Sequence, residues 1–383
     1  MTPRAPARDA HVLLTPAQLD LLMNALVRRG YEVTGPTIRD GAIIYDRLHS
    51  LEDLPRGWTD EQQGGKYRIK PRPDQAFFGY TVGPHAWKKF LFPATSPLWK
   101  AQRTNGDFRI LPEEQTPTKR AFLGVRACEL QAIHIQDKVF LEGPFSDAIY
   151  KSRRKNLLII AVNCTHAGGT CFCDSMATGP QASTGYDLSL TEVVDDQQHF
   201  FLVHIATNSG AKILSEIATQ PAGKAEIEAA TALVEEASRN MGRTLNTIGL
   251  KDLLYRNTEN PRWDAVVARC LSCANCTSVC PTCFCSTVDD LTDLTGQHAE
   301  RVRKWDSCFA TDFSYIHGGS VRATPRSKFR QWMMHKLAYW VDQFGTSGCV
   351  GCGRCITWCP VGIDITEEAR VIRDSESAVT ESV

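Results

Sequence analysis

Residues 270–281 read CLSCANCTSVCP, and residues 349–360 read CVGCGRCITWCP. Both stretches have the form C-x2-C-x2-C-x3-C-P. Three cysteines this close together can reach three corners of a cubane of iron and sulfide, and the fourth cysteine of such a run can ligate a second cubane. The spacing therefore predicts two [4Fe–4S] clusters in the last third of the chain.

Each motif is expected to give three ligands to its own cluster and one ligand to the other, as in two-cluster bacterial ferredoxins. We call the two predicted ligand sets the first site and the second site. The first site consists of Cys270, Cys273, Cys276 and Cys359. The second site consists of Cys349, Cys352, Cys355 and Cys280.

Residues around the motifs are expected to support the clusters. Pro281 and Pro360 turn the chain away after each fourth cysteine. Glycines in the second motif, at 348, 351 and 353, let that loop wrap closely around sulfide. Hydrogen bonds to sulfur, burial and nearby charges such as Arg269 and Arg354 are expected to set the reduction potentials.

Zinc is the alternative occupant, because C-x2-C pairs also bind this metal. Structural zinc sites usually take their four cysteines as two separated pairs, not as four in one run closed by proline. A zinc-stabilised interaction module stays open as a different class of function. Zinc without iron or acid-labile sulfide in anaerobically purified protein would establish it.

The composition narrows the remaining possibilities. The chain has 383 residues and fifteen cysteines, with 43 Lys and Arg against 43 Asp and Glu. This balance gives no general attraction to nucleic acid or to a membrane surface, and no segment has the roughly 18 apolar residues of a membrane span. The start lacks a signal-peptide pattern, so we expect a soluble cytoplasmic protein whose thiols serve in metal ligation or redox work.

The pattern along the chain predicts an α+β fold in three parts. Residues 1–115 form a small α+β region with a helix at 15–29 and strands at 42–45 and 66–69. Residues 116–260 form an α/β region with strands at 121–125 and 157–162 around a helix at 128–141, which is a βαβ pattern, followed by a strand at 200–205 and a helix at 223–240. Residues 261–383 form a cluster-binding domain with a buried helix at 326–344.

Four further cysteines follow the two predicted parallel strands. Strand ends gather at one edge of such a sheet, so their thiols could converge on a third cluster. We call this set the third site: Cys128, Cys164, Cys171 and Cys173. The alternative is that Cys128 is a small buried apolar residue and the others form a lone redox group or are inert.

Cys283, Cys285 and Cys308 complete the fifteen. They support the first cluster without ligating it, or they ligate a further centre together with Asp306. His166 is the one histidine beside cysteines. The chain has no G-x-G-x-x-G, P-loop, H-E-x-x-H or G-x-S-x-G motif, so we expect no nucleotide site and no catalytic residue on this chain.

Several stretches together carry a family resemblance: residues 87–93, 124–128 and 163–176, and both cysteine motifs. The chain resembles the β subunit of the soluble bidirectional [NiFe] hydrogenases (sulfhydrogenases) and its counterpart, the iron–sulfur electron-transfer subunit of anaerobic sulfite reductase. Its cluster domain resembles the α-helical ferredoxins, in which helices separate the two cluster loops.

This resemblance implies an electron-transfer subunit of an oxidoreductase complex. Its partners would be a flavin subunit that handles NAD(P)H and a catalytic partner, either a [NiFe] hydrogenase or a sulfite reductase. An autonomous ferredoxin-like carrier with a large N-terminal extension is the other interpretation of the residues. The size of the chain favours the subunit, because a free carrier needs little beyond its clusters.

Overall fold

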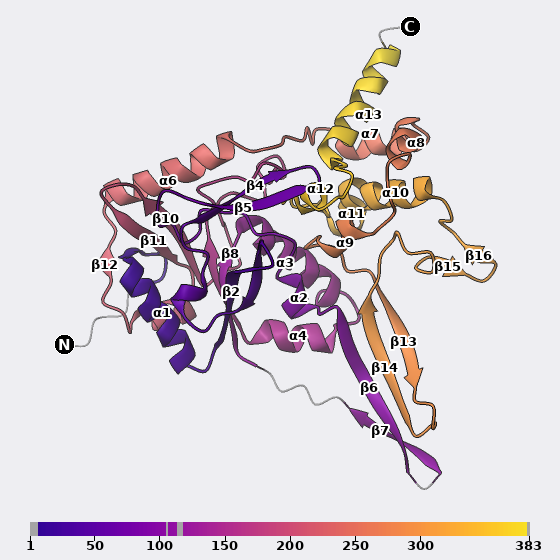
Figure 1. The fold of residues 1–383 in the computed structure, drawn as a ribbon, viewed down its shortest axis with the longest axis horizontal. Coiled ribbons are helices and arrows are strands. Elements are labelled where there is room, and N and C mark those ends of the chain that lie inside the picture. The colour runs from indigo at the N-terminus through magenta and orange to yellow at the C-terminus, as the bar shows by residue number, and fades with distance from the viewer. Residues whose placement is uncertain (1–6, 105, 113–117, 381–383) are drawn as a thin grey trace.

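The computed structural model describes residues 7–104, 106–112 and 118–380. Its largest element is an eight-stranded sheet with the order β12-β1-β11-β10-β9-β8-β2-β3, which fills the left half of Figure 1. The strands are β1 (His11–Leu14), β2 (Glu32–Arg39), β3 (Ala42–Arg47), β8 (Arg120–Val125), β9 (Leu157–Val162), β10 (Leu188–Val194), β11 (His199–Ile205) and β12 (Gln220–Pro221).

The centre of this sheet is parallel. β2, β8, β9 and β10 pair in parallel, and helix α3 (Ala127–Phe140) connects β8 to β9. This confirms the predicted βαβ pattern. Both strands flanking α3 are almost wholly apolar and buried, as expected for strands covered on both faces. The connection therefore places the residues after β8 and after β9 at the same edge of the sheet.

Helices cover both faces of the sheet. α1 (Pro16–Arg28) begins after Thr15, whose hydroxyl accepts the Gln18 N–H over 3.3 Å while the Gln18 side chain accepts the Thr15 N–H over 2.8 Å, so the predicted start is confirmed. Phe201 and Val203 of β11 pack in the core with α1, while Leu202 packs with α6 (Lys224–Arg239). Because neighbouring strand residues point to opposite faces, α1 and α6 cover opposite sides.

A second sheet forms an arm that projects from the body in Figure 1. Its four strands, in the order β13-β14-β6-β7, are β6 (Thr95–Thr104), β7 (Asp107–Pro112), β13 (Ser286–Thr292) and β14 (His298–Trp305). β6 and β14 pair in antiparallel fashion although nearly two hundred positions separate them along the chain. The sheet therefore joins the first and third predicted parts.

The predicted boundary at residue 115, a position outside the described residues, does not separate two sheets. β2 and β3 precede it, β8 follows it, and all three belong to the eight-stranded sheet. Local turn and periodicity signals locate strands but carry no information on which distant strand will be the partner. The residues between the two cysteine motifs also differ from expectation, because they begin with β13, β14 and the short pair β15 (Tyr315–Ile316) and β16 (Gly319–Ser320) before any helix.

The cysteine motifs lie among short helices at the right of Figure 1. These are α7 (Leu250–Arg256), α8 (Arg262–Val267), α9 (Asn275–Ser278), α10 (Pro325–Met334), α11 (Trp340–Phe344), α12 (Arg354–Thr357) and α13 (Ile365–Thr380). α10 and α11 are continuous through a π-helical segment, His335–Tyr339. Phe329, Trp332 and Leu337 are buried there, which confirms the predicted apolar stripe.

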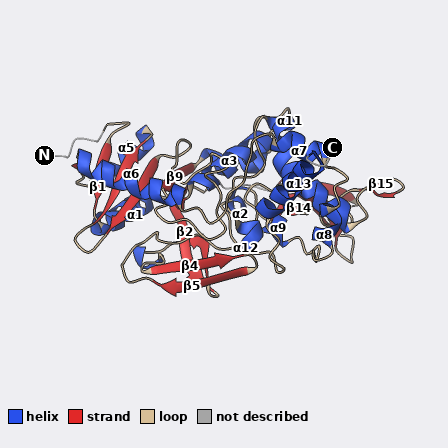
Figure 2. Cartoon of the chain, turned by 90° about the horizontal axis from the view of Figure 1, so that it is seen from above, coloured by secondary structure: helices blue, strands red, loops and turns tan. Residues whose placement is uncertain are grey.

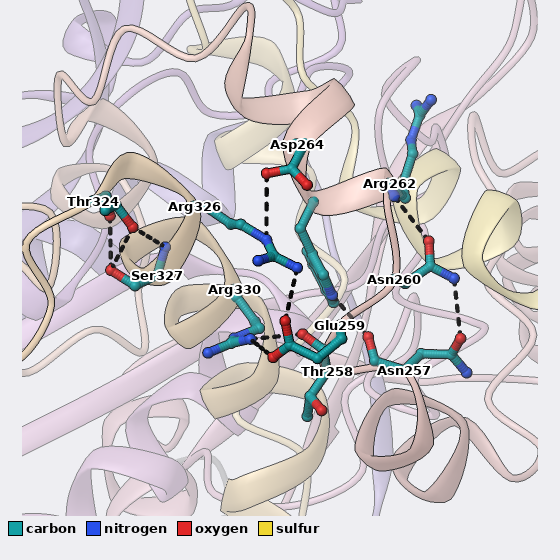
Figure 3. Close-up of polar contacts among 11 residues, drawn as sticks. Asn257, Thr258, Glu259, Asn260, Arg262, Asp264, Thr324, Arg326, Ser327 and Arg330 are labelled. Carbon is teal, nitrogen blue, oxygen red and sulfur yellow. Dashed lines mark hydrogen bonds and ion pairs between the residues drawn. The ribbon is translucent and has the colours of Figure 1, made fainter.

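Polar contacts hold α10 against α8. Glu259 accepts hydrogen bonds from Arg326 and Arg330 over 3.0 and 2.7 Å, and Arg326 also pairs with Asp264 over 3.3 Å (Figure 3). The start of α10 is capped by Thr324, whose hydroxyl accepts the Ser327 N–H. These contacts fix the helix whose inner face lines the first cysteine motif.

The smaller elements of the described chain are α2 (Lys88–Leu91), α4 (Ala148–Lys155), α5 (Asn208–Leu214), the 3-10 helix Leu51–Asp53 and the hairpin of β4 (Trp58–Gln63) with β5 (Lys66–Pro71). The hairpin lies beside α12, as Figure 2 shows, and its Gly65 N–H donates to the Ile356 carbonyl over 3.1 Å. None of the described helices combines the length and apolar character that crossing a bilayer requires.

Candidate iron–sulfur centre

The four cysteines of the first site line one cavity. Cys270, Cys273 and Cys276 reach it from the first motif, and Cys359 reaches it from the end of the second. Phe309, Phe329 and Trp332 form much of the apolar wall of this cavity. This confined space ringed by four thiols and aromatic side chains fits a cubane cluster.

The two cysteine loops share one backbone conformation. Positions three and five of each motif have left-handed φ angles, which residues other than glycine rarely adopt. They are Ser272 (52°), Ala274 (64°), Gly351 (64°) and Gly353 (73°). In each loop the first of these residues points its N–H at the first cysteine sulfur, over 3.4 Å to Cys270 and 3.5 Å to Cys349. Such N–H groups stabilise the sulfur ligands of clusters and tune their potentials.

The glycines of the second loop allow a neighbouring segment to approach. A Cβ atom on Gly353 would lie 2.3 Å from the Thr170 carbonyl oxygen, and one on Gly351 would lie 2.6 Å from the Phe172 backbone. The first loop has Ser272 and Ala274 at these positions, so the left-handed conformation alone does not demand glycine. The two glycines thus let residues 170–173, which carry two cysteines of the third site, pack directly against the second loop.

The second site is also assembled from both motifs. Burial is the main cause that raises the pKa of the Cys349 thiol to about 12. The Gly351 N–H and the charge of Lys336 oppose this rise, and the charges of Cys352 and Cys280 add to it. Burial raises the pKa of Cys355 well above its usual range, and Cys349, Cys352 and Cys280 contribute in turn. The four thiols therefore lie within electrostatic range of one another.

The first and second sites are neighbours. Cys276 of the first contributes to the raised pKa of Cys355 in the second, and Cys355 also lines the cavity of the first. The helices that carry these two cysteines, α9 and α12, pack against each other. The two cysteine sets thus lie side by side, with α9 and α12 in contact between them.

The third site gathers at the edge of the sheet predicted from the sequence. Cys128 lies in the first turn of α3, directly after β8, and the other three cysteines follow β9. Burial raises the pKa of Cys171 to about 12, with Cys164 the next cause that raises it. Burial likewise raises the pKa of Cys173, with Cys171 and Cys164 contributing. The structure therefore brings these thiols together.

The second and third sites are neighbours as well. Cys352 contributes to the raised pKa values of Cys128, Cys171 and Cys173. Its carbonyl oxygen also lies 4.0 Å from the Cys171 sulfur. The three cysteine sets consequently follow one another in the order first, second, third, from the helical region toward the large sheet.

The remaining three cysteines lie beside the first two sites. Cys283 lies beside Cys280, and its thiol lowers the pKa of Cys280 by hydrogen bonding. Cys308 contributes to the raised pKa of Cys276, and Cys285 contributes to the raised pKa of Cys308 itself. The Asp306 carboxylate accepts the Ser307 N–H over 2.6 Å. Both interpretations of these cysteines stay predictions.

Two buried lysines that the sequence analysis did not single out lie among these thiols. Lys336 has 5% of its surface exposed and its side-chain nitrogen lies 3.0 Å from the Cys280 sulfur. Lys88, also 5% exposed, lies 3.8 Å from the centre of the Trp305 ring and within range of Cys283. For Lys336, the sequence carries one sign of a buried position, because this lysine lies in the middle of the apolar stripe between Trp332 and Trp340.

The arginines expected to act as charges near the clusters are paired. Arg354 donates to Glu129 over 2.7 Å, with 6% and 1% of their side chains exposed. Arg269 donates to the buried Glu368 over 2.7 Å. Each carboxylate offsets its arginine, so their expected effect on the potentials is reduced. Sequence could not show this, because both partners lie far away along the chain.

Within the described residues, no group of three or more His, Cys, Asp or Glu side chains is placed to hold a single metal ion. His166 lies near Asp60. Burial lowers the pKa of His166, and the negative charge of Asp60 only partly offsets this effect.

Comparison with known proteins agrees with this geometry. Residues 269–363 match the family model of the 4Fe–4S dicluster domain. The chain is 29% identical over 344 residues to sulfhydrogenase 2 subunit beta of Pyrococcus furiosus, in an alignment that covers 86% of this chain and 98% of the relative. No solved structure matches the chain.

The fold and the site thus define an iron–sulfur protein with a 4Fe–4S dicluster domain. More particularly, the chain is similar to the β subunit of a sulfhydrogenase, and the resemblance stated from the sequence is confirmed.

Proposed function

We propose that this chain is the electron-transfer subunit of an oxidoreductase complex and relays electrons between a flavin subunit that handles NAD(P)H and a catalytic partner, a [NiFe] hydrogenase. The observation that carries this proposal is the row of three adjacent cysteine sets. A row of neighbouring redox centres suits transport across a protein better than a reaction at one point.

The proposed ligands are the eight motif cysteines, crossed between the two motifs. Each [4Fe–4S] cluster would supply one-electron oxidation and reduction at a potential set by its surroundings. This chain's own residues hold the ligand sulfurs, direct the N–H groups of Ser272 and Gly351 at them, and exclude water with aromatic side chains. No residue of the chain is proposed to make or break a substrate bond.

The third site is proposed to hold a third cluster. Its four cysteines lie at one edge of the large sheet, and Arg126, buried beside them, points a guanidinium nitrogen at the Cys164 sulfur over 3.9 Å. A positive side chain next to buried sulfur supports an anionic cluster there. The large sheet would then hold one end of the electron path and the helical, ferredoxin-like region the other.

The partner assignment follows the relative's name, which identifies a hydrogenase subunit. A sulfite reductase complex, in which this chain would be the electron-transfer component, is the nearest alternative. An autonomous ferredoxin-like carrier and a zinc-stabilised interaction module remain the alternatives from other classes. Co-purification of a stoichiometric flavin subunit supports the complex, whereas a monomer that exchanges electrons with many unrelated enzymes contradicts it.

Single cysteine replacements test the cluster assignment. Cys273→Ala and Cys352→Ala should each remove or convert one cluster, lower the iron content by up to about four atoms per chain, and interrupt electron flow. Ser278→Ala is the matched control, since Ser278 lies at an exposed position inside the first motif and carries no thiol. Unchanged iron content and activity in both motif variants would count against the assignment.

A further inference from the structure

The π-helical segment frees a backbone carbonyl beside the clusters. The Trp340 N–H donates to the carbonyl of His335, five residues earlier, where an α-helix would use Lys336. The Lys336 carbonyl instead accepts the Gly348 N–H over 2.8 Å and the Ser347 hydroxyl over 3.0 Å. Single π-helical turns often occur at functional sites, and this one ties the helix to the start of the second cysteine motif.

The side chain of the same lysine reaches the other motif. Its nitrogen lies 3.0 Å from the Cys280 sulfur and 3.2 Å from the Thr282 hydroxyl oxygen. Thr282 in turn donates to the Gly348 carbonyl over 2.7 Å. Lys336 therefore links both motifs at the point where the first motif lends its fourth cysteine to the second site.

The charge of Lys336 differs from that of the nearby arginines. Arg354 and Arg269 pair with buried carboxylates, but among the residues that the structure describes no Asp or Glu forms an ion pair with Lys336. A buried charge is costly unless an opposite charge compensates it. The side-chain atoms within hydrogen-bond distance of this ammonium are the Cys280 sulfur and the Thr282 hydroxyl oxygen. Of these two only the sulfur can carry a compensating negative charge.

We propose that Lys336 raises the reduction potential of the cluster held by the second site. This inference rests on the proposed function. Reduction adds a negative charge to a cluster, and a fixed positive charge in a poorly solvated interior stabilises the reduced form. A hydrogen bond to a ligand sulfur acts in the same direction, because hydrogen bonds to sulfur are among the features that set cluster potentials.

The test is a potentiometric titration of the full-length, anaerobically purified protein, followed by EPR spectroscopy. Lys336→Met removes the charge and the donor, while Lys336→Arg retains both. In Lys336→Met, the oxidised-to-reduced ratio of one cluster at a given applied potential should rise at least tenfold, equal to about 59 mV for one electron. Lys336→Arg should stay close to the parent protein.

Lys328→Met is the matched control, because Lys328 lies on the preceding helix α10 and is 8% exposed. It should leave all cluster potentials unchanged. If Lys336→Met does not retain its clusters, Lys336→Gln is measured instead, since the amide keeps a donor without the charge.

Two failures can be told apart. Parent protein without iron–sulfur signals would overturn the proposed function itself. Parent and variant protein with the same full set of clusters and the same potentials would leave the proposed function standing and overturn the role of Lys336.

Discussion

The guanidinium of Arg354 and the carboxylate of Glu129 form a buried ion pair with a nitrogen–oxygen distance of 2.7 Å. The pair joins the second cysteine motif to α3 of the large sheet. Glu129 also accepts hydrogen bonds from the Tyr45 hydroxyl and from the Trp87 indole, the latter over 3.1 Å. Glu129 thus contacts residues from three separate parts of the chain, including the loop that carries the second cysteine motif.

Glu129→Gln should destabilise the protein by about 3–5 kcal/mol, because it leaves the buried Arg354 charge without its partner. Thermal unfolding of anaerobically purified protein measures this as a lower apparent melting temperature. Glu61→Gln is the control, since its pair with Lys70 lies at the surface. A loss of stability no larger than that of the control would contradict the role given to Glu129.

Gly353→Ala should weaken the second loop while the equivalent position of the first loop tolerates a side chain. The left-handed backbone alone costs an alanine about 1–2 kcal/mol, and the contact 2.3 Å from Thr170 adds to this. Iron content and apparent melting temperature should both fall. Ala274→Gly, with the same backbone conformation, should keep its iron. Equal behaviour of the two variants would show that residues 170–173 do not impose the glycine.

The stability of the protein should depend on the protonation of His335. Burial, and then the charges of Lys336 and Arg322, lower the pKa of His335 from 6.5 to about 4. The unfolded chain therefore binds a proton between pH 6.5 and 4 that the folded chain does not, so stability present above pH 6.5 is lost as the pH falls toward 4. The lowered pKa corresponds to roughly 3 kcal/mol at most.

His335→Gln should reduce the fall in apparent melting temperature between about pH 7 and about pH 5, the range in which the unfolded histidine gains its proton. His317→Gln, at an exposed position between β15 and β16, serves as the control and should leave that fall unchanged. If both variants follow the parent protein across this range, His335 does not contribute the expected dependence.

Local features of this protein were readable from its sequence. The Thr15 cap and the apolar face of α1, the βαβ pattern around α3, and the stripe from Phe329 to Trp340 all depend on residues close together in the chain. The grouping of the cysteines that follow β8 and β9 was predictable because the ends of parallel strands lie at one edge of the sheet. Each of these features is fixed by short-range spacing and by the geometry of one element.

Long-range features were not readable. The pairing of β6 with β14 joins distant segments whose strand patterns name no partner. The neutralisation of Arg354 by Glu129 and the position of Lys336 against Cys280 depend on the packing of separate parts of the chain. The π-helical turn at His335–Tyr339 shows the same limit, since an apolar period of three to four residues does not distinguish it from an α-helix.

Iron, acid-labile sulfide and zinc per chain, measured on anaerobically purified protein together with EPR spectra after reduction, test the central claim most directly. Two clusters give about eight irons with matching sulfide, and the third site raises this to about twelve. We expect about twelve, with interacting EPR signals because the three sites are neighbours. Zinc in place of iron, without acid-labile sulfide, would contradict the account.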